Sequence, residues 1–171
     1  MSAETFTTAL FLITAVIAAG VLINAVFPVV YTMAGTFQSS THESDVRLRT
    51  DFKIVATFAN STPSAPARVQ VWMKNIGSQQ IPITDIQRSD VFCGPVGNFG
   101  RLNYIDGNPA SGQWTEVFIG VSDLNNNNYW DPGETIEIYA VPSIIPSSGN
   151  MVYFQFILPN GIWRSNEFAA S

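Results

Sequence analysis

Ala9-Leu-Phe-Leu-Ile-Thr-Ala-Val-Ile-Ala-Ala-Gly-Val-Leu-Ile-Asn-Ala-Val-Phe-Pro-Val-Val-Tyr31 is an almost wholly apolar run of 23 residues. It lies in a longer stretch between Glu4 and Glu43 that contains no Asp, Glu, Lys or Arg. At about 1.5 Å of rise per residue, a helix over this run spans roughly 34 Å, enough to cross a hydrocarbon core of about 30 Å. Residues 1–36 are therefore predicted to form a hydrophobic helix that crosses a membrane or packs among other helices.

Five positions of this helix are candidates for helix assembly. Ala15, Ala18 and Ala19 fall on one stripe, and small residues allow a second helix to approach closely, although they are also common in membrane spans. Asn24 is the single amide inside the run, and polar groups in lipid usually face a partner helix. Glu4 falls in the first turn, where it complements the helix dipole or pairs with an amine of a neighbouring subunit.

Composition excludes several classes of function. The net charge is −5 and the few basic residues are scattered singly, which argues against nucleic-acid binding. The chain contains no recognisable catalytic motif, so we expect no enzymatic activity. Cys93 is the single cysteine, which excludes an internal disulfide and a cysteine-based zinc site, and we expect it to be buried.

Residues 51–171 change to short runs rich in β-branched and aromatic residues, after a polar linker over residues 37–50. Turn residues separate the runs, and Pro159-Asn160-Gly161 is the strongest hairpin signal. The pattern predicts an immunoglobulin-like antiparallel β-sandwich. The expected strands cover residues 52–58, 68–74, 90–93, 114–121, 135–141, 151–158 and 162–165.

One segment has the spacing of a calcium-binding loop. Oxygen-bearing side chains recur at positions 1, 3, 5, 9 and 12 of a 12-residue stretch, with a backbone carbonyl available at position 7. Asn128 replaces the usual glycine at position 6, where Asn is the next-best residue for a left-handed conformation. The alternative is a polar hairpin tip, and Trp130 within it is the tryptophan expected at the surface. The candidate Ca²⁺ ligands are Asp123, Asn125, Asn127, Tyr129, Asp131 and Glu134.

A second candidate modification site is Asn60. The triplet Asn60-Ser61-Thr62 is an N-glycosylation sequon in a predicted loop, weakened by the following Pro63.

Several segments together carry a resemblance to a known family. They are Glu4–Ala9, Val21–Gly35, Leu48–Ile54, Val71–Gly77, Arg88–Phe92, Tyr129–Glu134 and Tyr153–Gly161. In these segments the chain resembles the FlaG family of euryarchaeal archaellum proteins, which is similar to archaellins and type IV pilins.

The resemblance implies a non-enzymatic, stator-like component of the archaellum, the rotary swimming filament of archaea. It implies a β-sandwich outside the cell, between membrane and S-layer, working with a FlaF-type partner and anchoring the motor against the S-layer protein. The weak charge bias of Arg47 and Arg49 points the other way. The resemblance also implies that the helix packs with other helices, which allows self-association.

Two alternatives stay open. The chain could be a pilin-like filament subunit, in which residues 5–36 would be buried among identical helices. It could also be a calcium-dependent extracellular adhesin or binding module, an interpretation that depends on the loop 123–134 alone.

Overall fold

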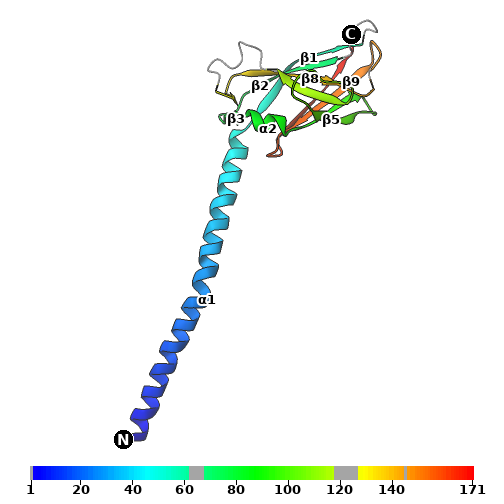
Figure 1. Ribbon diagram of the computed structural model, residues 1–171. Coiled ribbons are helices and arrows are strands. Elements are labelled where there is room, and N and C mark those ends of the chain that lie inside the picture. The colour runs from blue at the N-terminus through cyan, green and yellow to red at the C-terminus, as the bar shows by residue number, and fades with distance from the viewer. Residues whose placement is uncertain (1, 62–67, 118–126, 145) are drawn as a thin grey trace. The chain divides into compact units, whose positions relative to one another are not determined.

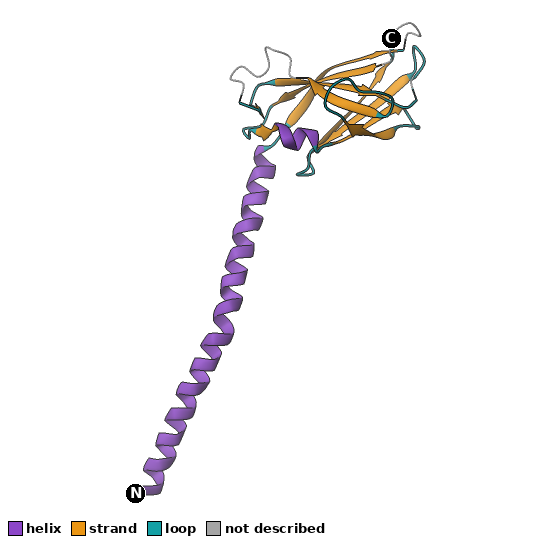
Figure 2. Ribbon diagram, in the orientation of Figure 1, coloured by secondary structure: helices purple, strands orange, loops and turns teal. Residues whose placement is uncertain are grey.

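The computed structural model describes residues 2–61, 68–117, 127–144 and 146–171. The chain divides into two compact units, Met1–Asp45 and Val46–Ser171. The first unit consists of helix α1 (Ser2–Arg49) up to Asp45, and the second is built mainly of strands (Figures 1 and 2). The predicted order, a long apolar helix followed by a β-sandwich, is confirmed.

Helix α1 does not end where the apolar run ends. Residues 37–49 contain no Gly or Pro that would break it, and its last turn carries Arg47 and Arg49, which complement the negative end of the helix dipole. Ser39 and Thr41 donate hydrogen bonds to the carbonyl oxygens of Gly35 and Phe37, at 3.1 and 2.8 Å. The segment 37–50, predicted as a polar linker, is therefore helical through Arg49.

The second unit contains ten strands and one short helix, α2 (Ile83–Gln87), within the described residues. The strands are β1 (Phe52–Asn60), β2 (Arg68–Asn75), β3 (Ile81–Pro82), β4 (Asp90–Pro95), β5 (Gly100–Tyr104), β6 (Gln113–Val117), β7 (Tyr129–Trp130), β8 (Thr135–Val141), β9 (Met151–Ile157) and β10 (Trp163–Ala169). The sequence did not predict β3, α2, β5 or β7, because elements of two to five residues carry too few positions to show a period.

Eight strands lie in the order β1-β2-β8-β6-β5-β4-β9-β10. Strands β1, β2, β8 and β6 pair antiparallel in one layer, and β5, β4, β9 and β10 pair antiparallel in the other. The layers are joined by a parallel pairing of β5 with β6, which places Tyr104 opposite Trp114. The sandwich is thus antiparallel apart from this one pairing, and β3 with β7 forms a separate small ladder.

The opposite margins of the sheet also meet. Strands β1 and β10 lie in contact, and Arg164 forms an ion pair with Asp51 at 2.5 Å. At the other end of β1, the amide of Ser171 donates to the carbonyl of Ala59 at 2.9 Å. Both layers are therefore tied together along the edge where β1 and β10 face each other.

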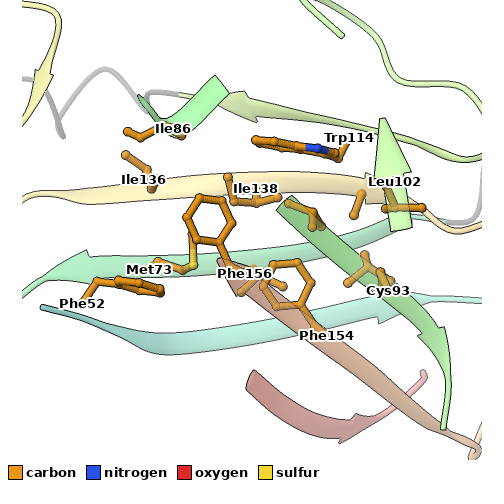
Figure 3. Close-up of a cluster of buried hydrophobic side chains, with 14 of the residues drawn as sticks. Phe52, Met73, Ile86, Cys93, Leu102, Trp114, Ile136, Ile138, Phe154 and Phe156 are labelled. Atoms are coloured by element: carbon orange, nitrogen blue, oxygen red, sulfur yellow. The ribbon is translucent and has the colours of Figure 1, made fainter. Parts of the chain in front are cut away.

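The core lies between the two layers (Figure 3). Alternate residues of the strands point inward, as a period of two requires. Cys93 is buried as predicted, and Trp114 makes an edge contact with Phe156 at a ring-centroid distance of 6.0 Å. The largest fully buried side chains are Phe52, Val71, Met73, Ile86, Val91, Trp114, Trp130, Ile136, Ile138, Val152, Phe154 and Phe156.

The expectation for Trp130 is wrong. Its side chain is 0% exposed and packs against Phe52 at a centroid distance of 5.8 Å, because β7 pairs with β3 and turns the indole into the core. Trp163 on β10 is instead 52% exposed.

The predicted hairpin at residues 159–161 is confirmed between β9 and β10. Gly161 has φ of 81°, and its amide donates a hydrogen bond to the carbonyl of Leu158 at 2.8 Å.

Candidate functional site

The first candidate site is the surface of α1. Residues 2–45 are exposed in the isolated chain, including the predicted stripe of Ala15, Ala18 and Ala19. Glu4 lies in the first turn, as predicted. The helix is long and apolar enough to cross a membrane. An apolar surface that covers all sides of a helix needs lipid or other helices around it.

The threonine hydroxyl groups of this helix are satisfied within it. Thr7, Thr14 and Thr32 donate to the carbonyl oxygens four residues earlier, at 2.6, 2.6 and 2.8 Å. Such bonds remove the cost of placing a hydroxyl in an apolar medium. Asn24 differs, because within the described residues its side-chain amide donates no hydrogen bond. In an apolar medium Asn24 therefore needs a partner from outside its own helix.

The second candidate site is the carboxyl-terminal half of the predicted calcium loop. Asn128 has φ of 62°, which confirms the left-handed conformation predicted for position 6. Asn127 accepts a hydrogen bond from the amide of Tyr129 at 2.9 Å and donates one to Asp131 at 2.9 Å. Glu134 accepts a bond from the amide of Asp131 at 2.8 Å. The side chains at positions 5, 9 and 12 thus already hold the turn together by mutual hydrogen bonds.

The structure describes only some of the predicted calcium ligands. Asp123 and Asn125 lie outside the described residues. Among residues that the structure describes, no group of three or more His, Cys, Asp or Glu side chains is positioned to hold a metal. The structure brings Asn127, Asp131 and Glu134 together within one turn. Because the other side-chain ligands lie outside the described residues, the calcium site stays a prediction.

Asn75 is the residue that sequence reasoning missed at this site. It is fully buried at the end of β2, and its side-chain amide donates to the carbonyl oxygens of Gln79 and Trp130, at 2.9 and 2.8 Å. Its side-chain oxygen accepts the amide of Gly77 at 3.0 Å. Its backbone amide also donates to the carbonyl of Glu134 at 2.9 Å. Asn75 therefore attaches the turn 127–134 to the end of β2.

A partly buried polar cluster joins α2 to β5 and β6. The Oε1 atom of Glu116 accepts hydrogen bonds from Gln87 at 2.9 Å and from the hydroxyl of Tyr104 at 3.1 Å. Burial, together with the negative charge of Glu116, raises the pKa of Tyr104 to about 12. The phenol therefore stays protonated at neutral pH and acts as a structural donor.

The predicted glycosylation site is described only in part. Asn60 is half-buried at the end of β1, while Thr62 of its sequon lies outside the described residues.

Known proteins match nearly the whole chain. A family model of archaeal-type flagellin matches residues 2–168. An uncharacterized protein from Archaeoglobus fulgidus is 26% identical over 173 residues, and the match covers 98% of each chain.

Solved structures give two further likenesses. The archaellum periplasmic stator protein FlaG from Sulfolobus acidocaldarius is 25% identical, with a TM-score of 0.52, over 70% of this chain and 99% of that chain. The same organism's complex of FlaF and FlaG matches at 25% identity and a TM-score of 0.51, over 68% of this chain and 87% of that chain. The archaeal flagellum of Methanospirillum hungatei has a TM-score of 0.67 over 97% and 93% of the two chains, but at 11% identity this likeness concerns the fold alone.

Proposed function

This chain belongs to the archaeal-type flagellin family, and on that premise we propose that it is a stator-like structural component of the archaellum. In this role α1 anchors the protein in the cell membrane, and the β-sandwich lies outside the cell, between membrane and S-layer. The protein works without catalysing a reaction. Its task is to hold a fixed position against the torque of the motor.

The observation that carries the proposal is the likeness to FlaG at 25% identity over 99% of that chain. The match to the Methanospirillum flagellum has a higher TM-score and extends over the helix, but it rests on 11% identity. The FlaG match covers 70% of this chain, whereas the flagellum match covers 97%, so the two likenesses differ in extent as well as in identity. Sequence identity therefore favours the stator over the filament subunit.

The chemistry of α1 supports an anchor that also contacts another helix. The threonine hydroxyls are bonded within the helix, so they do not oppose insertion into lipid. Asn24 is the amide of the apolar run, and a second helix can supply its hydrogen bond. A membrane-inserted helix of this kind forms small oligomers.

Electron microscopy of the purified full-length chain distinguishes the stator from the filament subunit. We expect small oligomers in detergent or nanodiscs, and these oligomers should persist when detergent is slowly removed in the presence of lipid. Helical polymers with α1 in their core would contradict the stator proposal and establish the filament alternative, which the fold likeness to the flagellum favours. An archaellin purified in the same way serves as the polymerising control.

The partner is proposed from the structure of the FlaF–FlaG complex. We expect the full-length chain in detergent to retain a FlaF-type protein on an affinity resin. An S-layer protein should be retained only when the FlaF-type protein is present. Retention of the S-layer protein by this chain alone would contradict the indirect linkage.

Cysteine labelling in intact cells tests the orientation. In a Cys93→Ala background, Ser165→Cys on exposed β10 should react with a membrane-impermeant maleimide, whereas Ser2→Cys at the start of α1 should not. The reverse pattern would place the sandwich inside the cell.

A further inference from the structure

The outer face of the layer that contains β2, β8 and β6 carries a pocket of about 530 Å³. We call it the outer pocket, and it lies in the usual volume range of small-ligand sites, roughly 300–1,000 Å³. Its lining includes no residue of the helix or of the turn 127–134, so a ligand bound there would serve a role beyond the proposed function. Its walls include Arg68, Asn108, Thr115, Val117, Tyr139 and Val141.

The strand pairing explains how these side chains come together. Tyr139 on β8 lies opposite Thr115 on β6, and Val141 lies opposite Gln113. Alternate residues of one strand share a face, so Tyr139 with Val141, and Thr115 with Val117, form one continuous outer surface. The outer pocket therefore rests on paired strands, which gives it a rigid floor.

The loop between β5 and β6 covers one side of the pocket and is held by hydrogen bonds from its backbone amides. The amide of Ala110 donates to the side chain of Gln113 at 2.9 Å, and the amide of Gly112 donates to the carbonyl of Val141 at 2.8 Å. Gly107 has φ of 111°, a conformation that other residues rarely adopt. The loop is thus formed before any ligand arrives, which lowers the entropic cost of binding.

The polar groups of the pocket are mostly hydrogen-bond donors. Arg68 lies over the ring of Tyr139, with its central guanidinium carbon 5.5 Å from the ring centroid. The Tyr139 hydroxyl accepts a bond from Gln70 at 2.9 Å, which leaves its own hydrogen for a ligand. Asn108 supplies an amide, and the Thr115 hydroxyl, which donates to the carbonyl of Glu116 at 3.5 Å, supplies an acceptor.

Arg68 differs from Arg101 and Arg164, which lie on other strands of the sandwich. Arg101 pairs with Asp90 at 2.6 Å, and Arg164 pairs with Asp51 at 2.5 Å. Within the described residues Arg68 has no carboxylate in ion-pair distance. A guanidinium beside a pocket, with hydroxyl and amide donors around it, matches an anion that also carries hydroxyl groups.

We propose that the outer pocket binds a small ligand that carries a carboxylate beside hydroxyl groups, of the size of one acidic sugar. Arg68 receives the carboxylate. The hydroxyl groups of the ligand form hydrogen bonds with Asn108, Thr115 and Tyr139. The apolar face of its sugar ring lies on Val117 and Val141.

An NMR titration of the full-length chain in detergent micelles tests this assignment with three probes. Glucuronate carries both a carboxylate and hydroxyl groups, glucose lacks the carboxylate, and glutarate lacks the hydroxyl groups. We expect glucuronate to shift the methyl signals of Val117 and Val141 saturably at millimolar concentration, and the other two probes to bind clearly more weakly. The absence of any saturable shift with glucuronate, or equal binding of glucose, would overturn the proposal. Equal binding of glutarate would overturn the role given to the hydroxyl donors.

Variants separate the site from a change in folding. Arg68→Gln should weaken glucuronate binding by about tenfold, the loss expected for one charge-assisted hydrogen bond. Tyr139→Phe should weaken it by a smaller factor. Arg101→Gln, on the opposite layer and outside the pocket, is the matched control and should bind as the parent chain does. Equal affinity of Arg68→Gln and the parent, with an unchanged methyl spectrum, would contradict the assignment.

Discussion

The side-chain amide of Asn75 donates a hydrogen bond to the backbone carbonyl of Trp130, at 2.8 Å, across 55 positions of the sequence. Asn75 ends β2, and Trp130 belongs to the small ladder of β3 and β7. A buried carbonyl that loses its donor pays the full cost of desolvation. This single bond therefore couples the burial of Trp130 to the end of a central strand.

Replacement of Asn75 should destabilise the sandwich. Asn75→Ala removes two donated bonds and one accepted bond at a buried position, and we expect a loss of about 3 kcal/mol in the free energy of unfolding. Urea unfolding of the full-length chain in micelles, followed by tryptophan fluorescence, measures it. Asn103→Ala, at an exposed position, is the control and should change stability little. A loss below that of the control would contradict the role of Asn75.

Substitution of Gly77 should also be costly, for a steric reason. A Cβ atom at this position would collide with the carbonyl oxygen of Arg49 and lie 2.6 Å from the amide nitrogen of Asp51. The same segment caps the end of α1, since the amide of Ser78 donates to the carbonyl of Arg49 at 2.9 Å. Gly77→Ala should therefore cost about 2 kcal/mol or more, measured by the same unfolding experiment.

Gly100 provides the matched control for this prediction. A Cβ atom there meets no heavy atom within 4 Å, and its backbone is not left-handed. Gly100→Ala should stay within about 0.5 kcal/mol of the parent. Equal effects of the two substitutions would show that the close approach at Gly77 is tolerated.

The thiol of Cys93 should be inert in the folded chain. Burial raises its pKa from the ordinary 9.0 to about 12, so the reactive thiolate is scarce at neutral pH. We expect no reaction with a thiol reagent until denaturant is added. A stoichiometric reaction under native conditions, at a rate independent of denaturant, would contradict this burial.

The same shift predicts the pH dependence of stability. Below the unfolded value of 9.0 both states hold the proton and the contribution of Cys93 is complete. As pH rises from there towards about 12, only the unfolded thiol ionises, so the free energy of unfolding falls by up to about 1.4 kcal/mol per pH unit. Just above pH 9.0, the free energy of unfolding of Cys93→Ala should fall less with pH than that of the parent chain. At higher pH the ionisation of Tyr104 also contributes to the fall.

Asn24 should contribute to association of α1 with other helices. Asn24→Leu is expected to weaken the oligomer by about 0.6–1 kcal/mol, the usual size of an interhelical hydrogen bond in a membrane. Energy transfer between labelled chains in micelles measures the association. Thr14→Val is the matched control, because the Thr14 hydroxyl is already bonded to Leu10 at 2.6 Å. A larger effect of Thr14→Val than of Asn24→Leu would contradict the prediction.

Calcium should stabilise the chain if the loop 123–134 is a metal site. At ten times its dissociation constant, calcium would add about 1.4 kcal/mol to the free energy of unfolding, measured by thermal unfolding of the full-length chain. Glu134→Gln keeps an acceptor for the amide of Asp131 but loses the charge, and should abolish the effect. Glu167→Gln, on exposed β10, should not. No shift of the parent at millimolar calcium would remove the metal site.

Local patterns in the sequence were sufficient for the elements that depend on neighbouring residues. The uncharged run predicts α1, because helix length and apolarity are properties of one continuous segment. Alternation predicts most long strands, and the turn residues Asn128 and Gly161 have the left-handed backbone expected of them. The chemistry of each position decides these features, and no distant contact is needed.

The tertiary structure alone decided how distant segments meet. The parallel pairing of β5 with β6 and the burial of Trp130 involve partners that no local period reveals. In the sequence, Asn75 has no feature that distinguishes it from other residues at strand ends. Its role becomes visible only in the fold, where its side chain donates a hydrogen bond to Trp130. Helix α1 continues to Arg49 because the polar segment lacks a breaker, and the carbonyl of Arg49 accepts hydrogen bonds from the amides of Ser78 and Gln79. Propensity is local, whereas burial and hydrogen-bond partners are set by the packed chain, and this difference separates what the sequence determined from what only the fold could decide.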